Sequence, residues 1–416
     1  MLPDAPSPVV PVPVRPVNPG RALAGIGAQR EALLALTAGL VAAPSANPPG
    51  DTRAPASVLA AFLGRAGVPH ETLRAVPDKP NVVASATGAA PGPHVVFCGH
   101  LDTILPGDPA DWTVDLHALT ERGPDLLGLG VGNMKGGLAA LAVALAWLHG
   151  RRAEWGGRVT LAAVADETVF GPHGAEWLLA TRPDLRGDVL ICGEGPGGMG
   201  LALAEKGVLW LEVQATAPAG QGMLTEPGAS ATARLAQALV ALDALGHVRA
   251  APPPGLECLG GGGAHGLRLS VNAGTLQGGG FISQRPGAAS AGLDLRVPPG
   301  LSLAEAEARV AAVCAGLPGV SWRRIKGWEA NWSLPASPAV AAVAWAAEQV
   351  RGAPPRPVVR LPGSDASRWR ALGVPAVCYG PQAAEASGPD DSIRADDLLD
   401  CAKAYALAAL ACLGRA

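Results

Sequence analysis

Three short apolar runs, separated by helical stretches, constrain the fold of this chain more than any other feature. Each run is continuous and ends in polar residues: 94–100 (HVVFCGH), 158–166 (RVTLAAVAD) and 188–194 (DVLICGE). Between them, residues 137–148 and 174–182 carry apolar side chains in helix-type stretches. Buried strands that alternate with helices predict an α/β domain with a mostly parallel sheet.

The polar residues that end these runs are the first candidates for a functional site. In an open α/β sheet, ligands bind beyond the carboxyl ends of the strands, where neighbouring loops meet. The side chains that fall at such ends are His100, Asp102, Asp166, Glu167 and Glu194. Imidazole and carboxylate groups bind metal ions or transfer protons, so the pattern predicts a catalytic site there.

The pattern changes near residue 207, where alternating segments replace the continuous runs. From there the order is strand, helix, two strands, helix and strand, which is typical of a ferredoxin-like α+β domain. The first twenty residues contain seven prolines and predict an extended tail. We therefore expect a Pro-rich tail at 1–27, a catalytic-type domain at 28–206 and 325–416, and an inserted α+β domain at 207–324.

The composition excludes several classes of function. A formal net charge of −3 provides no broad positive surface for nucleic acid or an anionic membrane. The longest uncharged apolar run, residues 136–148, is shorter than the roughly 18 residues that a membrane-spanning helix needs. The seven cysteines show no Cys-x-x-Cys spacing, which argues against a zinc ribbon. We expect a cytoplasmic protein that binds neither nucleic acid nor membrane.

Short motifs give the chain a resemblance to a known family. The motifs stand in the family's order: SANPPGD (45–51), GHLDT (99–103), GNMKGG (132–137), ADET (165–168), GE (193–194), LPGSDAS (361–367) and YGP (379–381), with GTLQGGG (274–280), SQRP (283–286) and LDLR (293–296) in the insert. The chain resembles the zinc-dependent aminoacylases and carboxypeptidases, which include acetylornithine deacetylase, succinyl-diaminopimelate desuccinylase and carboxypeptidase G. The resemblance implies a zinc-exopeptidase catalytic domain carrying a lid domain that forms a homodimer.

The same resemblance implies roles for four residues of the large domain. His100 matches a ligand of the first metal, and Asp102 matches the carboxylate that orients this imidazole. Glu167 matches the general base that deprotonates the attacking water. Glu194 matches the other carboxylate ligand of the first metal. We expect Glu167, His100 and Asp102 to be the catalytic residues.

Three other ligand positions depart from the family pattern. Asn133 stands where the family has the aspartate that bridges both metals, Thr168 where it has a glutamate, and Ser387 where it has the final histidine. A catalytic zinc needs about three imidazole, thiolate or carboxylate ligands, and the second metal loses all of its own. The interpretation is a degenerate site that holds no metal, or a single weakly bound zinc at His100 and Glu194.

The inserted domain supplies the expected substrate contacts. The resemblance implies that Arg296 grips a substrate carboxylate, for which a planar guanidinium is well suited. Ser283 and Gln221 replace an asparagine and a histidine that touch the substrate in the family, and Gly363 is expected to line the same pocket. A small molecule with a free carboxylate is therefore the predicted ligand.

Three hypotheses of function remain open from the sequence. The first is an enzyme that acts on an amide or acyl derivative of an amino acid, by hydrolysis, acyl transfer or proton transfer, with little or no metal. The second is a non-catalytic protein that keeps the carboxylate-binding pocket. The third is a metal-dependent N-acyl amino acid hydrolase whose site is completed by other residues, such as Glu385 or Asp390.

Overall fold

The computed structural model describes residues 18–261, 265–383 and 388–415, which form two compact units. Within this part of the chain, unit 1 lies in the ranges Met1–Leu203, Ser333–Val358 and Ser364–Ala416, and unit 2 in Ala204–Trp332 and Val359–Gly363. Residues 1–17, including most of the expected tail, lie outside the described residues. Residues 19–27, also assigned to the tail, instead form helix α1 (Pro19–Gly27), because Asn18 caps its first turn.

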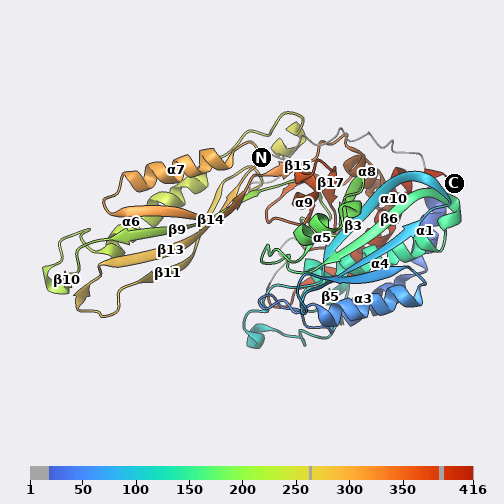
Figure 1. The fold of residues 1–416 in the computed structure, drawn as a ribbon, viewed down its shortest axis with the longest axis horizontal. Helices are drawn as coiled ribbons and strands as arrows, with labels where there is room; N and C mark the ends of the chain where they lie inside the picture. The colour runs from blue at the N-terminus through green and yellow to red at the C-terminus, as the bar shows by residue number, and fades with distance from the viewer. Residues whose placement is uncertain (1–17, 262–264, 384–387, 416) are drawn as a thin grey trace. The chain divides into compact units, whose positions relative to one another are not determined.

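A ten-stranded sheet forms the centre of unit 1, with helices on both faces (Figure 1). Its strands are β1 (His70–Arg74), β2 (Pro80–Thr87), β6 (Trp155–Val164), β3 (Ala90–His100), β7 (Val189–Cys192), β17 (Ala376–Cys378), β8 (Leu201–Glu205) and β15 (Asn331–Trp332) in order, with β16 (Pro357–Arg360) beside β8 and β19 (Gly414–Arg415) beside β6. Strands β6, β3, β7 and β17 are parallel to one another, and the outer strands are antiparallel.

The helices of unit 1 are α1, α2 (Arg30–Val41), α3 (Arg53–Arg65), α4 (Gly136–His149), α5 (Ala175–Thr181), α8 (Pro338–Arg351), α9 (Ala366–Ala371) and α10 (Ala395–Cys412). Helices α5 and α9 pack through Leu178 and Trp369 on the face of β3 that carries Cys98. On the other face of β3, Phe97 lies 6.3 Å from the ring of Tyr405 in α10. The central strands are therefore buried on both sides, as their continuous apolar sequences predicted.

Helix α4 is buried around almost its whole circumference. Its glycines permit this, because a Cβ atom on Gly137 would lie only 2.2 Å from the carbonyl oxygen of Gly193. The segment Val131–His149 is the one stretch among the described residues that is long and apolar enough to cross a membrane, and 89% of it is buried inside the structure. Such burial is typical of a core helix.

Unit 2 contains an antiparallel four-stranded sheet and two helices. The sheet order is β11 (Ser270–Gly278), β13 (Ala288–Val297), β9 (Gly207–Thr216) and β14 (Val320–Trp328), and the helices are α6 (Ala231–Asp243) and α7 (Leu303–Ala315). Ser230 caps α6, and Ser302 forms a capping box with Glu305 at the start of α7. The chain order β9-α6-β11-β13-α7-β14 is the predicted one, and the predicted fold class, a mostly parallel α/β sheet with an inserted α+β domain, is confirmed.

Two small sheets complete the fold. One joins β4 (Thr120–Arg122), β5 (Asp125–Leu127) and β18 (Ser392–Arg394) in unit 1. The other pairs β10 (Gly220–Gln221) with β12 (Gln284–Arg285) at one end of unit 2.

Candidate active site

Three neighbouring parallel strands bring the candidate residues of unit 1 together. Strand β3 ends at His100, Glu167 follows β6 and Glu194 follows β7. Because β6 and β7 flank β3 in parallel, their ends meet at the same edge of the sheet. Ligand atoms of these three residues lie within 4.8 Å of one another, and no other group of three such residues occurs in the described ranges.

The His100 imidazole is fully buried among polar groups. Its Nε2 atom lies 3.1 Å from Oδ1 of Asn133, 3.6 Å from Oε2 of Glu167 and 3.7 Å from Oε1 of Glu194. Burial lowers the pKa of His100, but the nearby Glu167, Glu194 and Asp102 carboxylates together raise this pKa well above its ordinary value. The arrangement places a proton-binding nitrogen between two carboxylates, as either acid–base chemistry or metal binding requires.

The contact between His100 and Asp102 differs from the expected one. The His100 Nδ1 atom lies 2.8 Å from the backbone oxygen of Asp102, whereas the nearer carboxylate oxygen is 3.7 Å away. The carboxylate instead accepts hydrogen bonds from Asn47 Nδ2 (2.9 Å), the Glu167 amide (3.2 Å) and both the amide (3.1 Å) and hydroxyl (2.8 Å) of Thr168. Asp102 therefore fixes the loop that carries Glu167, while its backbone orients the imidazole.

Asp166 lies behind this loop in a left-handed conformation with φ of 63°. Its carboxylate accepts hydrogen bonds from the Lys79 ammonium group, His173 Nδ1 (2.8 Å) and Asn47 Nδ2 (3.2 Å). Burial raises the pKa of Asp166, but the hydrogen bonds from these donors lower it by more. The pKa of Asp166 is therefore below its ordinary value. Sequence reasoning did not identify Lys79 or Asn47, although Asn47 lies inside the SANPPGD motif.

The glycine-rich loop before α4 positions Asn133. The amides of Gly130 and Gly132 donate to Oδ2 of Asp391, at 3.0 and 3.3 Å. Lys135 is buried, donates to the backbone oxygen of Ala43 at 2.8 Å, and burial lowers its pKa to about 7. The loop is thus held by an acid from the far end of the chain, which has no local signal in the sequence.

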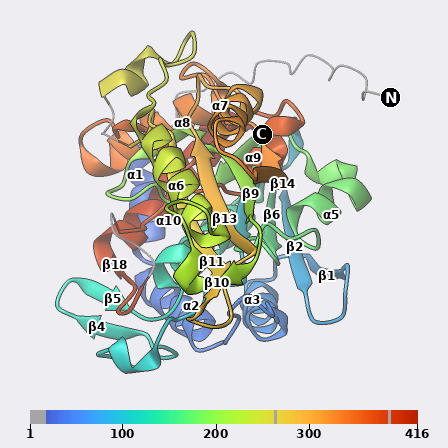
Figure 2. The ribbon, with the colours of Figure 1, turned by 90° about the vertical axis from the view of Figure 1, so that its left-hand side faces the viewer.

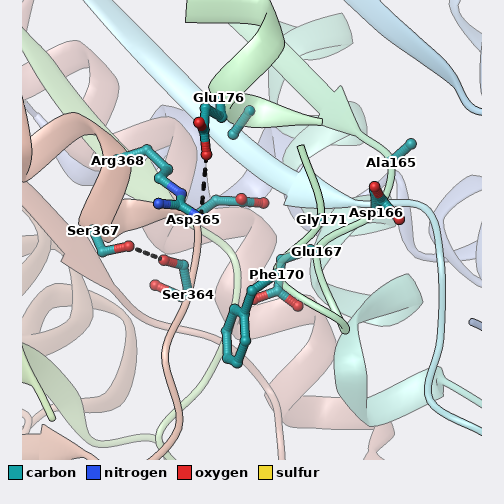
Figure 3. Close-up of a pocket in the computed structure, with 11 residues that line it drawn as sticks. Ala165, Asp166, Glu167, Phe170, Gly171, Glu176, Ser364, Asp365, Ser367 and Arg368 are labelled. Carbon is teal, nitrogen blue, oxygen red and sulfur yellow. Dashed lines mark hydrogen bonds and ion pairs between the residues drawn. The ribbon is translucent and has the colours of Figure 1, made fainter. Parts of the chain in front are cut away.

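A small recess of about 10 Å³ lies beside Glu167 (Figure 3). Asp365 lines it and is buried, and burial raises the pKa of this carboxyl group to about 7. On the same wall, Arg368 forms an ion pair of 3.6 Å with Glu176, and Phe170 lies beside Glu167. Asp365 belongs to the LPGSDAS motif but was not among the expected site residues.

The expected substrate contacts of unit 2 fall into separate places. Gln221 and Ser283 are neighbours, because β10 pairs with β12 and the Gly222 amide donates to the Ser283 oxygen at 2.8 Å. Arg296 pairs with Val208 near the other end of the sheet. From Ala288 to Arg296 the strand spans roughly 27 Å at 3.4 Å per residue, so one copy of unit 2 does not bring Arg296 and Gln221 together.

The remaining expected residues are Gly363, Ser387, Glu385 and Asp390. Gly363 accepts a hydrogen bond at its backbone oxygen from Nη1 of Arg360. Ser387, the residue in place of the final histidine ligand, lies outside the described residues, as does Glu385. Asp390 is described and accepts hydrogen bonds from the amide (2.9 Å) and hydroxyl (2.5 Å) of Thr113.

The fold and the buried His–Glu–Glu group define an α/β protein with its polar site at the strand ends. The model of peptidase family M20/M25/M40 matches residues 96–411, and the chain belongs to this family. It is 34% identical over 182 residues to a succinyl-diaminopimelate desuccinylase of Methylobacterium sp. (strain 4-46), covering 38% of this chain and 45% of that protein. For that of Paracoccus denitrificans (strain Pd 1222) the identity is 35% over 188 residues, covering 43% and 48%. The chain thus spans about half the length of the curated relatives it matches.

Solved structures show the same fold at low sequence identity. Human carnosine dipeptidase 1 has a TM-score of 0.76 and 16% identity, covering 95% of this chain and 99% of that chain. The M20 family metallo-carboxypeptidase Sso-CP2 from Sulfolobus solfataricus has a TM-score of 0.72 and 17% identity, covering 91% and 99%. The family assignment predicted from the sequence motifs is confirmed.

Proposed function

We propose that this chain is an M20-type enzyme that acts on an amide or acyl derivative of an amino acid with a free carboxylate. Glu167, His100 and Asp102 carry the chemistry in this proposal, with at most one metal ion. The observation that supports it most is the buried cluster of His100, Glu167 and Glu194 at the strand ends. Buried titratable groups cluster at catalytic sites, because burial and neighbouring charges there shift their pKa values to suit proton transfer.

The donor set does not fit two metal ions. The position of a bridging carboxylate holds the neutral amide of Asn133, whose Oδ1 faces His100. Thr168 stands at the position of a carboxylate ligand of the second metal, and its hydroxyl and amide both donate to Asp102. Two dications held close together need carboxylate charge between them, and neither residue supplies it.

The donor set does fit one ion. His100 Nε2 and the carboxylates of Glu167 and Glu194 are three nitrogen and oxygen donors within 4.8 Å, as a single zinc requires. When bound, zinc would lower the pKa of a water molecule and polarise a carbonyl group. In this proposal His100 and Glu194 would hold the ion, and Glu167, the third residue of the group, acts as the base.

The chain's own residues support proton transfer at this site. Glu167 is 7% exposed and lines the recess, so that a water molecule there can give its carboxylate a proton. Asp102 fixes the Glu167 backbone through its amide, and the Asp102 backbone oxygen fixes the His100 ring. The acid–base pair of Glu167 and His100 is therefore held in place by Asp102.

Arg296 supports the choice of a carboxylate ligand, with Gln221, Ser283 and Gly363 as further proposed contacts. Because Gln221 and Ser283 lie far from Arg296 along the strands, we propose that a homodimer combines these residues from two copies in one site. The curated relatives are named for removing a succinyl group from diaminopimelate, and the fold neighbour with the TM-score of 0.76 is a dipeptidase. Both names indicate amide bonds to amino acids.

The test combines metal analysis with turnover. Protein purified without chelator is analysed by mass spectrometry for metal, beside a variant that carries Asn133→Asp, Thr168→Glu and Ser387→His. A panel of N-acyl amino acids and dipeptides is then assayed with and without chelator. We expect at most one ion per chain in the parent, more in the variant, and product formation by the parent that Glu167→Gln abolishes.

Other outcomes separate the alternatives. Two zinc ions per parent chain, with loss of activity on addition of chelator, contradict the proposal. The chain is then a two-metal hydrolase. Ligand-induced stabilisation without any product identifies a binding protein, since a ligand at 100 times its Kd stabilises by about 2.7 kcal/mol.

A further inference from the structure

The loop that carries Glu167 is folded around the side chain of the preceding residue, Asp166 (Figure 3). The Asp166 backbone oxygen accepts a hydrogen bond from the Gly171 amide at 2.8 Å, and its carboxylate accepts one from His173 Nδ1 at 2.8 Å. A Cβ atom on Gly171 would lie only 1.9 Å from Asp166 Oδ2, so the loop closes tightly on this carboxylate. The position of Glu167 therefore depends on where the Asp166 carboxylate is held.

Asp166 adopts a backbone conformation that needs support from its surroundings. Its φ of 63° lies in the left-handed region, which few residues other than glycine adopt. Such a conformation persists only where the surrounding contacts over-determine it. The Asp166 side chain is also only 2% exposed, and a buried carboxylate needs partners that compensate its charge. Contacts to this carboxylate are therefore required to keep the loop in place.

Lys79 brings a positive charge to this carboxylate. It stands in the turn between β1 and β2, which form one edge of the ten-stranded sheet next to β6 (Figure 2). The ammonium group donates a hydrogen bond to Asp166 Oδ1, and the Lys79 side chain is 13% exposed. An ion pair so largely buried is screened much less than a pair on the surface. Lys79 therefore ties the edge hairpin of β1 and β2 to the loop that follows β6.

A single amide group connects Asp166 with Asp102 on the other side of the loop. Asn47 Nδ2 donates to Asp166 Oδ1 at 3.2 Å and to Asp102 Oδ2 at 2.9 Å. Asp102 is fully buried and accepts a hydrogen bond from the Glu167 amide at 3.2 Å. Asn47 is neutral, whereas Lys79 compensates the charge of one of the two carboxylates that share this donor. A shift of Asp166 would therefore reach the Glu167 backbone both directly and through Asn47.

We propose that Lys79 is a positioning residue, whose ammonium group holds Asp166 and so keeps the Glu167 carboxylate beside His100. Oε2 of Glu167 lies 3.6 Å from His100 Nε2, and a displacement of about 1 Å can slow a reaction by roughly a hundredfold. Lys79 contacts Asp166, one residue before Glu167, so it acts through the loop. Its effect on turnover rests on the proposed function, but its effect on the loop does not.

The first experiment measures native-state hydrogen exchange in the full chain at the Glu167 and Gly171 amides, which donate to Asp102 and to the Asp166 backbone oxygen. Lys79→Met removes the cation, and we expect both amides to exchange roughly ten- to a hundredfold faster. Exchange at Leu161, in the centre of β6, reports on the whole fold and should stay as in the parent. Lys79→Arg keeps a positive charge and should exchange within about threefold of the parent.

Two further variants show whether the effect passes through Asp166. Lys403→Met is the matched control, because it removes a comparable ion pair of 3.2 Å with Asp400 in α10, where the two side chains are 22% and 20% exposed; no change at Glu167 is expected. Lys79→Met combined with Asp166→Asn removes both charges of the pair. Residues in contact have non-additive effects, so this double variant should exchange no faster than Lys79→Met.

The second experiment measures turnover by the same variants on the panel of N-acyl amino acids and dipeptides. Because Lys79 positions the base and not the substrate, Lys79→Met should lower kcat roughly ten- to a hundredfold and leave KM within about twofold of the parent. Lys79→Arg should restore most of kcat. A loss of stability alone would not produce this split between kcat and KM.

The outcomes separate this inference from the proposed function. Unchanged exchange at Glu167 in Lys79→Met, or a raised KM with unchanged kcat, overturns the inference and leaves the proposed function intact. Lys79→Arg that behaves like Lys79→Met, or effects that multiply in the double variant, also overturn it. Exchange at Glu167 that depends on Lys79, in a parent that turns over no member of the panel, supports the role of Lys79 in the loop and contradicts the proposed function.

Discussion

Replacing Thr168 by valine isolates one contact that fixes the loop carrying Glu167. The Thr168 hydroxyl donates to Oδ2 of Asp102 at 2.8 Å, and Asp102 is completely buried. Valine keeps the shape of threonine and leaves the backbone amide bond to Asp102 in place. The change therefore removes one donor from a buried carboxylate and little else.

The magnitude follows from the remaining partners of Asp102. A hydrogen bond to a charged group is worth about 1.5–3 kcal/mol. Because Asn47 and the amides of Glu167 and Thr168 remain as donors, we expect the low end of this range, about 1.5 kcal/mol. Local opening of the loop then becomes about tenfold more frequent.

The assay is native-state hydrogen exchange at the Glu167 amide, which donates to Asp102 at 3.2 Å. We expect Thr168→Val to accelerate its exchange about tenfold while Leu161, in the centre of β6, exchanges as before. Thr181→Val is the control, because this exposed hydroxyl donates to the neutral backbone oxygen of Trp177 at 2.8 Å. Equal exchange at Glu167 in the parent and Thr168→Val would refute the anchoring role of Thr168.

Two further predictions concern packing and acid titration. Gly137→Ala should lower the free energy of unfolding, measured with urea, by about 2 kcal/mol or more, because its Cβ would lie 2.2 Å from the Gly193 oxygen. Gly27→Ala is the control, because a Cβ there would meet nothing within 4 Å, and it should be neutral or stabilising in the same measurement. Burial raises the pKa of Asp391 to about 6, above its ordinary 3.8. Between about pH 4 and pH 6 the unfolded chain therefore binds fewer protons at this group than the folded chain does. The free energy of unfolding contributed by Asp391 falls as the pH rises through this range. Asp391→Asn should therefore gain stability relative to the parent between pH 4 and pH 7, and a constant difference between the two would contradict this.

The positions of His100, Glu167 and Glu194 were predictable because they depend on local pattern. A continuous apolar run marks a buried parallel strand, and the residue after it must lie at the carboxyl edge of the sheet. The structure places all three at the ends of adjacent strands β3, β6 and β7. Strand order brought the three residues together, because β3 lies between β6 and β7.

The partners of Asp102 were not predictable in the same way. Asn47 reaches this carboxylate from 55 residues away, and Asp391 reaches the Gly130 amide from 261 residues away. Such contacts depend on how loops meet in three dimensions, and periodicity within a segment carries no information about them. The expected Asp102–imidazole contact differed for the same reason, since competing donors from Asn47 and Thr168 occupy the carboxylate.

Two neutral residues, Asn133 and Thr168, form hydrogen bonds within the site. Asn133 Oδ1 lies 3.1 Å from His100 Nε2, and the Thr168 hydroxyl lies 2.8 Å from Asp102. A buried carboxylate or imidazole without a partner is a costly unsatisfied group, and these two contacts supply partners to Asp102 and His100. Asn133 contacts His100 and Thr168 contacts Asp102, so both neutral side chains have hydrogen-bond partners within the site. These contacts support the proposed function, in which Glu167 and His100 act with at most one metal ion.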